Sequence, residues 1–157
     1  MTLEPLNDRM RPPAESAVVI VCETDGHWAV AMRREAGNGQ PPLRETRSLA
    51  ECWELLERHA ASFAVVEMTR ANLDGLLTRL AGLRSRFPRA RLAVVADRRL
   101  AAAQWLVREA GAVHVVTSPR QVKPLVSMAY RHVVAAASPR RGLAEETWKC
   151  LPWSGPT

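Results

Sequence analysis

Short apolar runs alternate with longer amphipathic stretches along the chain, and the alternation repeats five times. Four of the runs are continuous and rich in β-branched residues, which is typical of strands buried on both faces of a parallel sheet. They cover residues 17–21, 63–66, 92–95 and 112–116, and a more polar run at 43–47 fits an edge strand. This pattern predicts a parallel sheet covered by helices.

The stretches between the strands carry apolar residues at helical spacing. Ser48 with Glu51 three positions later forms a capping-box pattern at one helix start. Pro88 ends another helix, and Gly111 is a C-cap. The predicted helices cover residues 27–35, 49–60, 76–87, 100–110 and 122–133.

Strand and helix alternation with right-handed crossovers predicts an α/β fold of the flavodoxin-like type, a doubly wound five-stranded parallel sheet. The domain is expected over residues 16–137, after a polar lead-in at 1–15 and before a tail at 138–157. Such sheets bind ligands at the carboxyl ends of their strands. The residues expected at that edge are Cys22, Glu23, Glu67, Ala96, Asp97, Thr117 and Ser118.

Composition narrows the class of protein further. A chain of 157 residues is about one domain. Cys22, Cys52 and Cys150 are too scattered for a zinc spacing or a disulfide framework, so a reducing, cytoplasmic setting is expected. No segment approaches the roughly 18–20 apolar residues of a membrane helix. The formal net charge is +6, and nearly all of the cations are arginines.

Two local patterns resemble the receiver domain of response regulators in two-component signalling, over roughly residues 16–137. The run from Phe63 to Glu67, followed seven residues later by Asp74-Gly75, is similar to the family's third strand, its acceptor position and the start of the next helix. The run 110–119, Ala-Gly-Ala-Val-His-Val-Val-Thr-Ser-Pro, is similar to the family's fifth strand and its closing Lys-Pro. The resemblance implies the (βα)5 receiver fold and a role in a phosphorelay.

The resemblance also implies a phosphorylation pocket in which most chemical groups differ. Receivers bind Mg²⁺ through an acidic pair and the acceptor aspartate, and hold phosphoryl oxygens with a Thr or Ser and a Lys. The corresponding positions here are Cys22, Glu23, Glu67, Ala96 and Ser118. Only Glu23 keeps its character, so the resemblance implies a pseudo-receiver, with no catalytic residue and no cofactor.

Two other interpretations of this pocket are open. Glu67 could act as a permanent mimic of a phosphorylated acceptor, because it carries a negative charge further into the crevice. Glu23 and Glu67 could together hold a divalent ion, because two nearby carboxylates favour a proton or a metal.

A protein partner, which could be a second copy of the chain, is the expected ligand of a pseudo-receiver. The resemblance implies an interaction face made of the fourth helix, fifth strand and fifth helix, where the chain carries Gln104, Arg108, Arg120, Met128 and Arg131. The tail offers Trp148 and Trp153 as a docking segment. Nucleic-acid binding is the alternative, and it predicts one basic face formed by Arg84, Arg86, Arg89, Arg91, Arg120 and Arg131.

Overall fold

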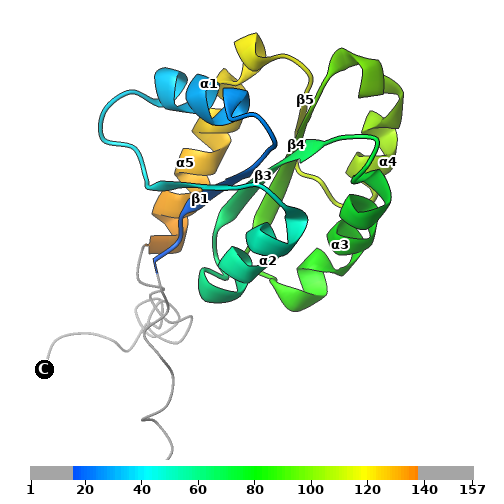
Figure 1. The fold of residues 1–157 in the computed structure, drawn as a ribbon. Helices are drawn as coiled ribbons and strands as arrows, with labels where there is room; N and C mark the ends of the chain where they lie inside the picture. Colours follow the sequence, from blue (N-terminus) through cyan, green and yellow to red (C-terminus); the bar gives the residue numbers. More distant parts are fainter. Residues whose placement is uncertain (1–15, 138–157) are drawn as a thin grey trace, which may run out of the picture.

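A computed structural model describes residues 16–137, so the predicted lead-in and tail lie outside the described residues. Five parallel strands form one sheet in the order β2-β1-β3-β4-β5, which confirms the predicted flavodoxin-like topology (Figure 1). The strands are β1 (Val19–Cys22), β2 (Leu43–Thr46), β3 (Phe63–Met68), β4 (Arg91–Ala96) and β5 (Val115–Val116).

Five α-helices and two 3₁₀ segments accompany the strands within residues 16–137, and η2 and α5 follow the last strand. The helices are α1 (His27–Ala36), α2 (Leu49–Arg58), α3 (Leu73–Arg86), α4 (Gln104–Glu109) and α5 (Lys123–Ala137), and the 3₁₀ segments are η1 (Arg98–Ala103) and η2 (Pro119–Gln121). None of the helices in residues 16–137 is long and apolar enough to cross a membrane.

The helices divide between the two faces of the sheet, as Figure 1 shows. Helices α1 and α5 cover one face, where Trp28 and Leu125 lie in one buried cluster. Helices α2, α3 and α4 cover the other face, where Leu56, Leu76 and Val107 lie in a second cluster. The central strands separate two apolar cores, which explains why their sequences are continuously apolar.

The helix-end hydrogen bonds at Ser48 and Gly111 agree with the sequence patterns, except for the partner of the Glu51 carboxylate. The Ser48 hydroxyl accepts a hydrogen bond from the Glu51 amide at 3.2 Å, as the capping-box pattern predicts. The Glu51 carboxylate accepts from the amide of Arg47 rather than from that of Ser48. Gly111 adopts φ 119° just after α4, and the Ala112 amide bonds the Val107 carbonyl, which is a Schellman ending.

The segment 100–110 differs from the prediction of one continuous α-helix. Its first part belongs to η1, and the α-helical part covers only Gln104–Glu109. Asp97 caps the 3₁₀ turn by accepting from the Arg99 amide, and no residue of η1 is buried. Only Leu100 and Ala103 of η1 pack against the core, and both stay partly exposed, so the segment gains little from α-helical periodicity.

Strand β5 is also shorter than the predicted run at 112–116. The Ala112 amide still bonds the Val107 carbonyl at the end of α4, whereas Val113 and His114 already form backbone hydrogen bonds with Leu92 and Val94 of β4.

Candidate functional site

The carboxyl edge of the sheet carries two adjacent hollows that share Glu67. The first hollow has a volume of about 400 Å³, and the second has a volume of about 490 Å³. Cys22, Glu23 and Arg47 line the first hollow, whereas Ala96 and Ser118 line the second. The structure therefore gathers the other four pocket residues expected from the sequence around Glu67.

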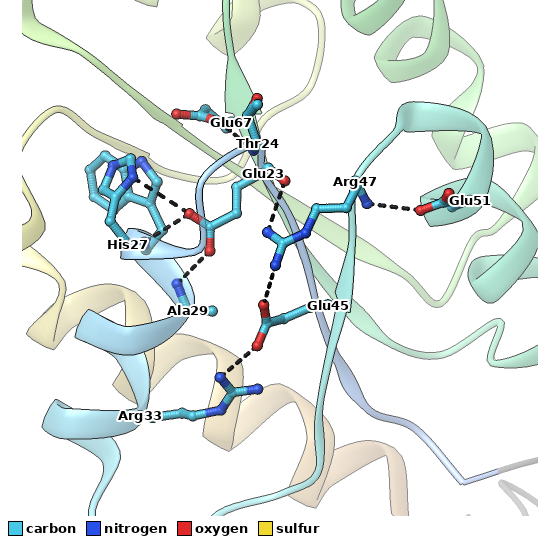
Figure 2. A network of polar contacts seen from close by, with 10 residues as sticks. Glu23, Thr24, His27, Ala29, Arg33, Glu45, Arg47, Glu51 and Glu67 are labelled. Carbon is cyan, nitrogen blue, oxygen red and sulfur yellow. Dashed lines mark hydrogen bonds and ion pairs between the residues drawn. The ribbon is translucent and has the colours of Figure 1, made fainter.

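Glu23 is buried at 2% exposure, and both of its carboxylate oxygens are engaged by the start of α1. One oxygen accepts from the Trp28 amide at 2.8 Å, and the other accepts from the Ala29 amide at 2.7 Å (Figure 2). The N-cap residue Gly26 has no side chain that could cap the helix, so Glu23 takes over that role. Its negative charge also lies at the positive end of the helix dipole.

Glu67 connects β3 to the loop that follows β1. Its carboxylate accepts a hydrogen bond from the Thr24 amide at 2.9 Å, as Figure 2 shows. Its backbone carbonyl accepts from the side-chain amide of Asn72 at 2.8 Å, and that side chain also accepts from the Thr69 amide. Glu67, at the acceptor-like position, is therefore hydrogen-bonded to the loop after β1 and to the loop after β3.

Arg47 is a pocket residue that the sequence analysis missed. Its guanidinium donates to the Glu23 carbonyl at 3.2 Å and to the Glu45 carboxylate at 3.0 Å. Glu45 also forms an ion pair with Arg33 of α1, so the network joins β1, β2 and α1 (Figure 2). The position of Arg47, at the carboxyl end of the predicted edge strand 43–47, was the signal that could have identified it.

Two thiols and a hydroxyl lie below the first hollow. Cys22 ends β1, Cys52 is in α2, and Thr46 is the register partner of Cys22 on β2. A hydrogen bond between the two thiols lowers the pKa of Cys22, although burial opposes the change. The same bond, together with burial, raises the pKa of Cys52 well above its ordinary value.

The second hollow has few free polar groups at the expected positions. Ala96 is fully buried and has no hydroxyl. The Ser118 hydroxyl accepts from the Arg120 amide at 3.4 Å and so caps η2. Within residues 16–137, no group of three or more His, Cys, Asp and Glu side chains is arranged to hold a metal ion.

The expected interaction face is formed by α4, β5 and α5, with η2 beside it. Arg108, Arg120 and Arg131 are exposed there, whereas Gln104 and Met128 are half-buried. The sequence analysis missed Trp105, which is 63% exposed on α4, and Val113, which is 40% exposed before β5. Trp148 and Trp153 lie outside the described residues.

The six arginines of the nucleic-acid interpretation do not gather on one face. Arg84 and Arg86 are in α3, and Arg131 is in α5 on the opposite face of the sheet. Arg91 begins β4, whereas Arg120 follows β5, so these two lie at opposite edges.

Comparisons with known proteins show the fold. No protein-family model matches the sequence, and no curated protein is significantly similar to it. A response regulator from Thermotoga maritima superposes with a TM-score of 0.59 at 17% identity, covering 76% of this chain and 98% of that one. An orphan response regulator of H. pylori also gives 0.59 at 17% identity, with 77% and 99% covered.

A CheY-like protein, TadZ from Pseudomonas aeruginosa, gives a TM-score of 0.55 at 18% identity, covering 71% of this chain and 92% of that one. The chain therefore has the flavodoxin-like receiver fold. At these identities the likeness concerns the fold alone.

Proposed function

We propose that this chain is a non-enzymatic signalling module, a pseudo-receiver that acts by binding a protein without being phosphorylated. The fold supports the signalling role, because the similar structures are response regulators and a CheY-like protein. The pocket supports independence from phosphorylation, because its polar groups are bonded within the protein.

The observation that carries the proposal is the position of Glu23. It is the one acidic residue left at the pair that would hold Mg²⁺, and both of its oxygens accept from amides of α1. A metal ion bound through this buried carboxylate would compete with these bonds for the same two oxygens and weaken the cap of the helix. Cys22 replaces the other carboxylate, and a thiol is a poor ligand for a hard ion such as Mg²⁺.

The transfer step lacks support at three other positions. Glu67 is one methylene longer than aspartate, and its carboxylate is bonded to the Thr24 amide. Ala96 has no hydroxyl, and Ser118 has no charge to stabilise a phosphoryl oxygen. The cation nearest the first hollow, Arg47, is already bonded to Glu45 and to the Glu23 carbonyl.

The same geometry gives less support to Glu67 as a permanent phosphoryl mimic. A mimic acts only if a neighbouring group responds to its charge, and Ala96 cannot do so. The Ser118 hydroxyl already bonds the Arg120 amide. Nucleic-acid binding is likewise less supported, because the arginines are distributed over both faces and both edges of the sheet.

An amide NMR titration with Mg²⁺ and then beryllofluoride, which imitates a phosphoryl group, tests the proposal. The wild-type chain is expected to show no shifts that localise around Thr24, Glu67 and Ser118. The positive control is a variant with the receiver groups restored, namely Cys22→Asp, Glu67→Asp, Ala96→Thr and Ser118→Lys, and it is expected to gain such shifts. Localised, saturable shifts in the wild type would refute independence from phosphorylation.

A further inference from the structure

An apolar groove lies between α1 and α5 at the amino edge of the sheet, the edge opposite to the two hollows around Glu67. This α1–α5 groove has a volume of about 300 Å³, at the lower end of the range of roughly 300–1,000 Å³ for ligand pockets. Its lining includes apolar side chains that are almost fully buried, namely Val19, Met32, Val126 and Ala129. Tyr130 of α5 also lines it and is 41% exposed. A groove of this size accommodates one large apolar side chain rather than a long ligand.

Positive charge borders the α1–α5 groove on the side of α1. Arg33 lines the groove, and its side chain is 51% exposed although it pairs with Glu45 of β2. Arg34, the next residue of α1, is exposed as well. Opposite charges on two surfaces favour their association and fix its orientation. The groove therefore fits an apolar side chain that has acidic neighbours.

The end of α5 brings the continuing chain close to this groove. The helix ends at Ala137, seven residues beyond Tyr130, which corresponds to about 10 Å along an α-helix. Figure 1 shows the end of α5 and the start of β1 at the same end of the sheet. Pro139 follows two residues later, and a proline cannot continue the helix. The tail at 138–157 therefore begins a short distance from the groove.

The tail contains one segment with the required combination of residues. The run 143–151 is its longest stretch without proline or glycine, and Trp148 in it follows Glu145 and Glu146. A tryptophan side chain can bury roughly 150–250 Å², so leaving it in water forgoes a large gain. Trp148 is eleven residues after Ala137, and an extended chain of that length spans up to about 36 Å. Trp148 therefore reaches the groove with chain to spare.

We propose that the tail of this chain docks on its own domain and that the indole of Trp148 occupies the α1–α5 groove. The acidic pair before Trp148 then lies near Arg33 and Arg34. Because the tail is tethered to α5, its effective concentration at the groove is on the order of millimolar, so a modest affinity is enough. The docked tail covers the ring of Tyr130 and links α5 to α1. This inference goes beyond the proposed function and does not depend on it, since the groove and the hollows lie at opposite edges of the sheet.

Amide NMR spectra of the full wild-type chain and of Trp148→Ser test the docking. An indole in the groove shifts nearby amide signals through its ring current, so the two spectra are expected to differ at residues 32–43 and 126–133. Signals of α3, on the other face of the sheet, are expected to stay unchanged, which shows that the domain remains folded. Trp153→Ser is the matched control in the same tail, and it is expected to leave the groove signals in place.

A variant of the groove tests the same contact from the other side. Tyr130→Ser removes an aromatic ring at an exposed position, so the domain is expected to fold. The chain has five tryptophans, and the Nε1–H signal of Trp148 is the one that Trp148→Ser removes. In Tyr130→Ser this signal is expected to move toward the position of free tryptophan. Val30→Ala, at an exposed residue of α1 that does not line the groove, is expected to leave it in place.

A dilution series separates the chain's own tail from other occupants. Docking within one chain does not depend on protein concentration, so the wild-type signals of residues 32–43, outside the face of α4, β5 and α5, are expected to stay constant. The proposal is overturned if those signals change on dilution, since the groove would then hold a second copy. It is overturned as well if Trp148→Ser leaves the groove signals unchanged, which would leave the groove to a separate partner, or if only Trp153→Ser moves them.

Discussion

At the scale of single residues, Glu23 shows how backbone hydrogen bonds can hold a buried carboxylate. Removing a carboxylate from water is costly unless hydrogen bonds replace those to water. Here two amides at the start of α1 replace them, at 2.8 and 2.7 Å. Gly26, the N-cap residue, adopts φ 84° and has no side chain that could accept a hydrogen bond from those amides. The carboxylate and the helix start therefore satisfy each other.

Replacing Glu23 with Gln is expected to destabilise the folded chain by about 1–3 kcal/mol. The side-chain amide keeps one acceptor oxygen, but its NH₂ group faces a backbone amide that then has no acceptor. Chemical denaturation measures the change. Glu35→Gln is the control on the same helix, and it is expected to change stability by less than about 0.5 kcal/mol because Glu35 is exposed. Equal effects of the two substitutions would contradict the capping role.

The sequence predicted which residues meet at the pocket but not what each one bonds. Residues that follow parallel strands reach the same edge, so Cys22, Glu67 and Ser118 were predicted to be neighbours. The role of Glu23 as a helix cap depends on the path of the loop from residue 23 to residue 28, which has no periodic signal. Arg47 was missed because the Glu23 carbonyl approaches it only after β1 and β2 have paired, whereas Glu45 is its neighbour along the chain.

At the scale of elements, α5 is fixed to the sheet partly through His132. Its Nε2 atom lies 2.9 Å from the Ala61 carbonyl, and its ring meets Phe63 edge-on. Burial lowers the pKa of His132 below its ordinary value of 6.5, and the charges of Arg91 and Arg89 lower the pKa further. The folded chain therefore favours the neutral imidazole more than the unfolded chain does.

This difference predicts that acid weakens the folded state. Below pH 6.5 the unfolded chain takes up a proton at this residue before the folded chain does, so stability falls as the pH drops from there toward the lower pKa of the folded state. Melting temperatures of the wild type are expected to fall between pH 7.5 and 5.5.

In His132→Gln the fall is expected to be smaller. Comparing two pH values within each protein cancels the variant's own change in stability. Some dependence should remain, because burial and Arg108 also lower the pKa of His114. An unchanged fall in the variant would exclude His132 as its source.

Prediction from the sequence succeeded best for elements with a continuous apolar pattern. Strands β3 and β4 and helix α3 bury side chains at regular spacing, and the sequence indicated each of them. The segment that became η1 contains leucine and alanines but buries none of them fully, so its composition predicted an α-helix that its partial packing does not support. The predicted start of β5 at Ala112 was too early, because the amide of that residue bonds the Val107 carbonyl in the turn after α4.

At the scale of the whole molecule, the face of α4, β5 and α5 carries apolar side chains that the described residues leave uncovered. Trp105 on α4 is 63% exposed, and Val113, in the segment between α4 and β5, is 40% exposed. A large exposed aromatic residue is a frequent anchor of protein interfaces. This feature supports the proposed action through a protein partner, for which a second copy of the chain is the simplest candidate.

Replacing Trp105 with Ala is expected to weaken self-association by roughly tenfold or more, since loss of an interface tryptophan often costs ~2 kcal/mol or more. Sedimentation equilibrium over a range of concentrations measures the change. Val30→Ala is the control, because Val30 is 54% exposed on α1, which is not one of the elements of this face. Two results together would count against a role for this face. The wild-type chain would stay monomeric, and the wild type and Trp105→Ala would retain the same proteins from a lysate.

The strand order also limits how such complexes can be built. The two outer strands are β2, with four residues that include Arg44 and Glu45, and β5, with two residues. An outer strand can pair with another chain through its row of unpaired backbone N–H and C=O groups. Short strands have few such groups, and charged side chains discourage the pairing. Copies of this domain therefore have almost no template on which one sheet could continue into the next. Recognition between copies therefore depends on contacts between side chains, and single substitutions can change those contacts.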